Sequence, residues 1–127
     1  MKNLFSITLI ILCVINSKVA LSDWKLVSKA PDGNEYFVDQ DSIEKVNQYI
    51  FYKYLSNFNK PIKGIKSAST FAQVDCKLMR FKRVSIKVYK KPMGQNLIGS
   101  RTHNQKEWDY PQPKSSMGNI LNFVCNP

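Results

Sequence analysis

The sequence is poor in the residues from which enzymes build catalytic centres. Its 127 residues contain one histidine, His103, with three cysteines and five glycines. A catalytic triad or a zinc site would have to be built around His103 alone, and no glycine-rich phosphate loop is present. His103 lies among polar residues at 102–105, which is typical of a surface loop. We therefore predict a protein that is not an enzyme, with no metal and no cofactor.

Long apolar runs are also lacking. The run at Leu4–Ile15 has twelve residues, whereas a membrane-spanning helix needs roughly 20. Lys2 precedes this run, and Ala20-Leu21-Ser22 follows it with small residues at the spacing that signal peptidase requires. We interpret residues 1–22 as a signal peptide and residues 23–127 as a single exported domain.

Two alternatives to a cleaved signal peptide remain open. The first is an uncleaved N-terminal anchor, although no charged residue directly follows the apolar run. The second is a lipoprotein with its lipid on Cys13, which the bulky Leu12 disfavours because small residues are wanted there. We expect the exported domain in the periplasm or on the outer surface of a Gram-negative bacterium.

Acidic residues are scarce and unevenly placed. Residues 23–127 hold 17 basic and 9 acidic side chains, a net charge of +8. Asp23–Glu44 carries six acids and two lysines, whereas Lys77–Lys106 carries nine basic residues and no acid. Such an asymmetry favours polyanions or acidic surfaces as partners. Nucleic acid would suit the charge but conflicts with export, and a composition rich in lysine and asparagine also arises from AT-rich genomes.

Two cysteines remain in the exported domain, Cys76 and Cys125. An even count in an oxidising compartment predicts one disulfide, and two free buried thiols are the alternative. Closing a loop of about 50 residues would contribute roughly 4 kcal/mol to stability in the chain-entropy model.

Short apolar segments separated by turn residues predict a mainly β structure. We expect a turn at Pro31–Asn34, a single helical turn at Asp41–Glu44 with a polar cap, and a polar loop at Asn57–Lys66. The expected strands cover Trp24–Val27, Glu35–Asp39, Gln48–Leu55, Ala68–Asp75, Leu78–Tyr89 and Leu97–Arg101.

The fifth strand and the C-terminus carry further structural signals. Phe81 is out of phase with the alternating valines and isoleucine that follow, so a β-bulge near Lys82-Arg83 is expected. After a capping serine at 115 or 116, a helix with one apolar stripe is predicted, formed by Met117, Ile120, Leu121 and Val124. Cys125 borders this stripe, so a bridge to Cys76 would join helix and sheet. The predicted fold is α+β: a curved antiparallel sheet of about five to six strands with one C-terminal helix packed on it.

Taken in order, these residues resemble a known family. They are Trp24, Tyr36-x-Val38-Asp39, Ser42-Ile43, Asp75-Cys76, Arg80, Tyr89, Met93-Gly94, Trp108 followed by Pro111, and Val124-Cys125. The set is similar to the surface-adhesin protein E family of Gram-negative bacteria and covers essentially all of residues 23–127. The resemblance implies a curved sheet, a packed C-terminal helix and a helix-to-sheet disulfide. For the adhesin that names the family, it also implies binding to host vitronectin, laminin and plasminogen.

Several aromatic residues are open to two interpretations. Trp24 and Trp108 can be ligand platforms, but in a small domain such residues more often fill the core. On the aromatic strand, alternation buries one set and exposes the other. If Tyr49 and Phe51 face the core, then Tyr52 and Tyr54 form either an outward contact surface or a cross-strand ladder.

A basic stretch is the main candidate binding site. We predict that ligands contact Arg80, Lys82, Arg83, Lys87, Tyr89, Lys90 and Lys91. Because Val84, Ile86 and Val88 take the core side, Arg83 and Lys87 are expected on one exposed positive face with Lys90 and Lys91. The alternative is a solvated face or a lysine-guarded edge strand.

Two functions follow from this candidate site. In the first, an exported adhesin-type module uses its basic sheet face to contact acidic host proteins, sulfated glycans or other polyanions. In the second, a periplasmic envelope-associated protein of structural role contacts lipopolysaccharide or anionic lipid. A homodimer is left open.

Overall fold

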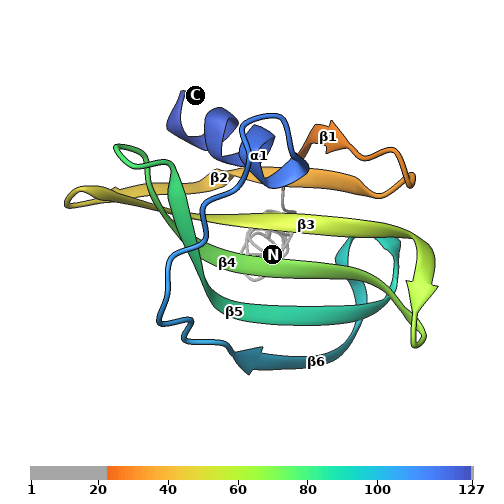
Figure 1. Cartoon of the computed structure of the whole chain (residues 1–127). Coiled ribbons are helices and arrows are strands. Elements are labelled where there is room, and N and C mark those ends of the chain that lie inside the picture. Colours follow the sequence, from red (N-terminus) through yellow and green to blue (C-terminus); the bar gives the residue numbers. More distant parts are fainter. Residues whose placement is uncertain (1–22, 127) are drawn as a thin grey trace, which may run out of the picture.

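The computed structural model describes residues 23–126, which form a six-stranded antiparallel sheet and one helix (Figure 1). The strands pair in sequence order, so each one neighbours the strand that follows it in the chain. The elements are β1 (Trp24–Lys29), β2 (Glu35–Val46), β3 (Tyr49–Ile62), β4 (Ile65–Asp75), β5 (Arg80–Lys91), the 3₁₀ turn η2 (Pro92–Gly94), β6 (Gln95–Thr102) and α1 (Ser116–Cys125). This confirms the α+β fold of a curved antiparallel sheet with a C-terminal helix.

The predicted helical turn at Asp41–Glu44 is wrong, because this segment belongs to β2. The register of β2 against β3 shifts between Asp39 and Glu44, so the strand is irregular here. The Ser42 hydroxyl donates to the backbone oxygen of Asp39 (2.6 Å) and accepts from the backbone N–H of Lys53 (2.8 Å). Ser42 therefore connects the two strands where the backbone ladder is interrupted, which lets the strand continue.

The predicted loop at Asn57–Lys66 is also wrong, because β3 and β4 form a hairpin there. Lys63 and Gly64 make its turn, both with positive φ (49° and 80°). The tip is polar because it extends past the core. Asn59 fixes it to the β1–β2 turn, since its backbone N–H donates to Asn34 Oδ1 (2.9 Å) and its side chain donates to the backbone oxygen of Asp32 (3.0 Å).

The expected bulge in β5 lies at Val84. Ser85 pairs with Phe71 and Arg83 pairs with Ala72, so Val84 has no direct partner on β4. The prediction near Lys82-Arg83 is confirmed to within one residue. The extra residue returns Phe81 and the later apolar residues of β5 to the same side of the sheet.

The helix α1 packs on one side of the sheet, over β1, β2 and β3 (Figure 1). Ser115 caps it by accepting from the backbone N–H of Gly118 (3.1 Å), and a side chain at Gly118 would collide with the carbonyl oxygen of Gln112. The predicted apolar stripe is confirmed, with Ile120, Leu121 and Val124 fully buried. The sheet contributes to the same core with Val38, Tyr52, Tyr54, Ala72, Val74 and Phe81.

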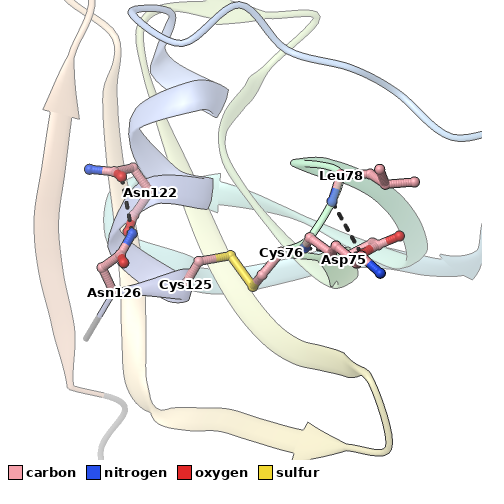
Figure 2. Close-up of a disulfide and its surroundings, with 7 residues drawn as sticks. Asp75, Cys76, Leu78, Asn122, Cys125 and Asn126 are labelled. Atoms are coloured by element: carbon pink, nitrogen blue, oxygen red, sulfur yellow. Dashed lines mark hydrogen bonds between the residues drawn. A yellow bond between two sulfur atoms is a disulfide. The ribbon is translucent and has the colours of Figure 1, made fainter.

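The predicted disulfide between Cys76 and Cys125 is present and joins the β4–β5 turn to the end of α1 (Figure 2). Beside it, Asp75 Oδ1 accepts from the backbone N–H groups of Lys77 (3.2 Å) and Leu78 (3.4 Å). The carboxylate therefore holds the shape of the turn from which Cys76 reaches the helix.

Candidate functional site

The two sides of the sheet differ in character. We call the side that carries α1 the helix face and the opposite side the open face. Cross-strand partners share a side, so the registers assign each strand residue. The larger residues of the open face include Trp24 of β1, Tyr49, Phe51 and Lys53 of β3, Phe71 and Gln73 of β4, and Arg80, Lys82, Lys87, Tyr89 and Lys91 of β5.

A hollow of about 330 Å³ lies on the open face. Its lining comes from β1, β3, β4 and β5 and includes Trp24, Lys53, Ser69, Phe71, Ser85, Lys87 and Tyr89. At one side, the Tyr89 hydroxyl and Ser69 Oγ share a hydrogen bond of 2.9 Å. We call this hollow the open-face pocket. It combines two cations, three hydroxyls and three aromatic rings.

A second cluster on the open face surrounds Trp108. The chain after β6 pairs with β5, because Phe81 and Asp109 exchange two backbone hydrogen bonds (3.0 and 2.9 Å). This pairing places the indole ring of Trp108 against two cations, with Arg80 at 4.3 Å and Lys82 at 4.6 Å from the ring centroid. The Tyr49 ring lies 5.6 Å away. Cations and aromatic faces attract each other electrostatically, so the cluster orients both side chains.

The core interpretation of the two tryptophans is wrong. Trp24 lines the open-face pocket and Trp108 covers Arg80 and Lys82, and neither belongs to the buried apolar cluster beneath α1. The sequence does not reveal the pairing of the segment after β6, on which the position of Trp108 depends.

The outward tyrosine surface is also absent. Tyr52 and Tyr54 are buried on the helix face, with 0% and 4% of their surface exposed. Burial raises the pKa of Tyr52 far above its usual range, and the nearby Tyr54 adds to the effect. Phe51 lies on the opposite side and stacks on Phe71 at 5.7 Å. The predicted alternation is confirmed, and it puts Tyr52 and Tyr54 in the core and Phe51 on the open face.

Arg83 does not share a face with Lys87, contrary to the prediction. Because Val84 is the bulge residue, Arg83 points to the helix face, where its Nη1 pairs with Asp109 Oδ2 (3.0 Å) and its Nε donates to the Tyr54 hydroxyl (3.2 Å). Burial works to lower the pKa of Arg83, but Tyr54 and Asp109 outweigh it and raise that pKa. Arg83 is therefore a structural residue of the helix face.

The other predicted residues divide between the faces. Arg80 lies on the open face, but its Nε pairs with Asp75 Oδ2 (2.9 Å) and its Nη1 donates to the Tyr110 hydroxyl (3.3 Å). The hydrogen bond with Tyr110 is the main cause of a raised pKa of Arg80. Lys82, Lys87, Tyr89 and Lys91 also lie on the open face, and alternation along β5 puts Lys90 on the helix face.

The lysines of the open face form no salt bridge with the described residues. Among residues 23–126, the salt bridges are Arg80–Asp75 and Arg83–Asp109, so the acidic Asp23–Glu44 segment neutralises no basic side chain directly. Sequence reasoning missed Lys53 and Phe71 as site residues, and it favoured the core role for Trp24 over the ligand platform. These residues come together through the register between strands, which places one residue from each strand side by side. The sequence pattern of a single strand does not predict that register.

His103 and the acidic residues form no metal-binding cluster in the described part of the chain. Within 23–126, no three histidine, cysteine, aspartate or glutamate side chains lie close enough to hold a metal ion. The side chain of His103 is exposed, and its backbone N–H donates to the Val84 oxygen (2.8 Å). The same part of the chain has no helix of the length and apolar character needed to cross a membrane. The expected signal peptide lies outside the described residues.

Comparison with known proteins gives a clear family assignment. The family model for surface-adhesin protein E matches residues 24–126. The chain belongs to this family. No curated protein sequence matches it significantly.

Solved structures of Haemophilus influenzae protein E have the same fold. Crystal form II is 18% identical, with a TM-score of 0.61 over 84% of this chain and 90% of that chain. A selenomethionine form is 17% identical, with a TM-score of 0.62 over 85% and 92%. The non-typeable H. influenzae protein is 16% identical, with a TM-score of 0.54 over 86% and 78%. Family membership supports a role as a surface adhesin, which is a binding protein.

Proposed function

We propose that this protein is an adhesin-type binding module, displayed on the outer cell surface, whose open face contacts acidic host proteins or polyanions. Membership in the surface-adhesin family supports a binding role. The observation that carries the choice of face is that four lysines lie among partly exposed aromatic rings on the side of the sheet that α1 leaves uncovered. Lys53, Lys82, Lys87 and Lys91 lie on the open face without a salt bridge to any residue in 23–126.

The aromatic residues support binding at the same place. Trp24, Phe71 and Trp108 lie between or beside these lysines and are only partly covered. Aromatic rings supply apolar contact area at low conformational cost, and unpaired lysines attract an anionic partner from a distance. The lysines therefore attract an anionic partner to this face, and the aromatic rings contact it once it is bound.

The experiment uses the protein from residue 23 onward and immobilised heparin as the polyanion. Lys82→Glu/Lys91→Glu reverses two lysines of the open face outside the pocket. We expect binding to weaken roughly tenfold or more, since each lysine near an anionic surface contributes about 1 kcal/mol. Raising the salt concentration should weaken binding of the unaltered protein.

The control is Lys63→Glu/Lys90→Glu, which makes the same change in net charge in the β3–β4 turn and on the helix face. It should weaken binding much less. Equal losses from the two double variants would show that net charge matters and the open face does not, which would refute the proposal.

The envelope-associated alternative is favoured by one different observation. Leu97 and Ile98 on the edge strand β6 are 58% and 55% exposed, close to Lys91 at the end of β5. Exposed apolar side chains beside a lysine suit the surface of an anionic lipid. Co-sedimentation with vesicles containing anionic lipid, lost in Leu97→Ser/Ile98→Ser but retained in Lys82→Glu, would favour this alternative over the adhesin.

A further inference from the structure

We propose that the open-face pocket binds a single anionic sugar unit, a pyranose ring that carries a sulfate or phosphate group. The inference rests on the proposed binding function and specifies the ligand class of one part of the open face. It depends on the size of the pocket, its charge and the kinds of side chain that line it.

The pocket has the size of a small-ligand site. Its volume of about 330 Å³ lies at the lower end of the roughly 300–1,000 Å³ typical of such sites. The lining comes from four strands of one sheet, so the positions of the side chains are fixed by the hydrogen-bonded registers rather than by a loop. A site on strands holds its groups more closely in place than a site on loops.

The charge in the pocket favours an anion. Lys53 and Lys87 line it from β3 and β5, and neither forms a salt bridge within residues 23–126. The nearest acid in the register is Asp39, the cross-strand partner of both Trp24 and Lys53. Asp39 is only 7% exposed, its Oδ1 accepts from the Asp41 backbone N–H (3.1 Å), and it does not line the pocket. The accessible charge is therefore positive.

The remaining lining distinguishes a sugar from a simple anion. Trp24, Phe71 and Tyr89 provide aromatic surface, against which the C–H groups of a pyranose can pack. Ser69 and Tyr89 provide hydroxyls that already form a hydrogen bond with each other, and each retains capacity for a sugar hydroxyl. Inorganic phosphate would leave the rings unused, and a neutral sugar would leave the two ammonium groups unpaired.

The probes are small enough to occupy the pocket alone. They are a sulfated heparin disaccharide, the same disaccharide after desulfation, and glucose 6-phosphate. With ¹⁵N-labelled protein from residue 23 onward, we expect the sulfated or the phosphorylated probe to shift backbone amide signals around Lys53, Phe71 and Lys87. Desulfation should weaken binding about tenfold, the equivalent of ~1.4 kcal/mol. The preferred probe identifies the source of the ligand as a sulfated glycan or a sugar phosphate.

The matched variants are Lys87→Gln and Lys90→Gln, which remove one charge each from opposite faces of the same strand. Lys87→Gln should weaken binding of the preferred probe about tenfold, and Lys90→Gln less than about twofold. Trp24→Ala should weaken binding of the charged probe while the dispersed amide spectrum remains.

The proposal is overturned if neither charged probe shifts the pocket amides, or if Lys87→Gln and Lys90→Gln have equal effects. If long-chain heparin still binds in a manner sensitive to Lys82→Glu/Lys91→Glu, only the pocket is refuted and the proposed function stands. If long-chain heparin also fails to bind, the proposed function falls with it.

Discussion

Two basic residues of β5, one on each face of the sheet, are used differently. On the helix face, Arg83 is bonded to Asp109 and Tyr54 and lies over the Phe81 ring at 4.9 Å. On the open face, Lys87 comes from the same strand but has no salt bridge within residues 23–126. Guanidinium groups suit fixed, multidentate contacts, whereas lysine ammonium groups remain mobile and hydrated. We infer that the helix face maintains the fold and the open face is available for a partner.

The largest effect on this contrast should come from removing the disulfide. Cys125→Ser releases the end of α1, which covers the helix face, from the β4–β5 turn. We expect the free energy of unfolding to fall by about 2–5 kcal/mol, measured by urea denaturation without reductant. Thiol titration of the unaltered, denatured protein should find no reactive Cys76 or Cys125. Two reactive thiols would contradict the assignment.

A comparison of Arg83→Ala with Lys87→Ala tests the division of roles directly. Arg83→Ala leaves Asp109 and the Tyr54 hydroxyl without their charged partner, so we expect a loss of about 1–2 kcal/mol in unfolding free energy. Lys87→Ala removes an exposed, unpaired charge and should change that value by less than about 0.5 kcal/mol. Similar losses in the two variants would remove the distinction between the faces.

Sequence patterns predicted the elements better than their orientation. Periodicity located the helix, because Ile120, Leu121 and Val124 form one stripe, and it placed the bulge within one residue of Val84. That one residue decides which side Arg83 occupies, since each step along a strand reverses the side. The position of Trp108 depends on a bridge between Asp109 and Phe81, which are far apart in sequence. The candidate site was therefore only partly predictable.

The two buried tyrosines of the helix face provide a finer comparison. The Tyr52 hydroxyl is buried and has no hydrogen-bond partner among the described residues, whereas the Tyr54 hydroxyl accepts from Arg83. Tyr52→Phe should therefore be neutral or stabilising by up to about 1 kcal/mol, and Tyr54→Phe should destabilise by about 1 kcal/mol. Thermal denaturation at neutral pH measures both, and a larger loss in Tyr52→Phe would contradict the assignment.

Tyr52 should also make the folded protein less stable at alkaline pH. Burial raises the pKa of Tyr52 in the folded protein, while the unfolded chain ionises near the ordinary value of 10.0. Above about pH 10 the folded state therefore retains a proton that the unfolded state has lost, and stability falls by about 1.4 kcal/mol per pH unit from this group. Tyr52→Phe should remove that contribution, so its unfolding free energy should decline less steeply between about pH 10 and 11.

The smallest effect is expected at His103, which follows β6 and belongs to neither the buried core nor the lining of the open-face pocket. Its fold contact is a backbone N–H donated to Val84, which any residue except proline can supply. Because the side chain is exposed, His103→Ala should change the unfolding free energy by less than about 0.5 kcal/mol and leave heparin binding unchanged. A catalytic role for His103 would use this imidazole as base or ligand. If the unaltered protein catalyses a reaction and His103→Ala abolishes it, then His103 belongs to an active site that lies outside both the helix-face core and the open-face pocket.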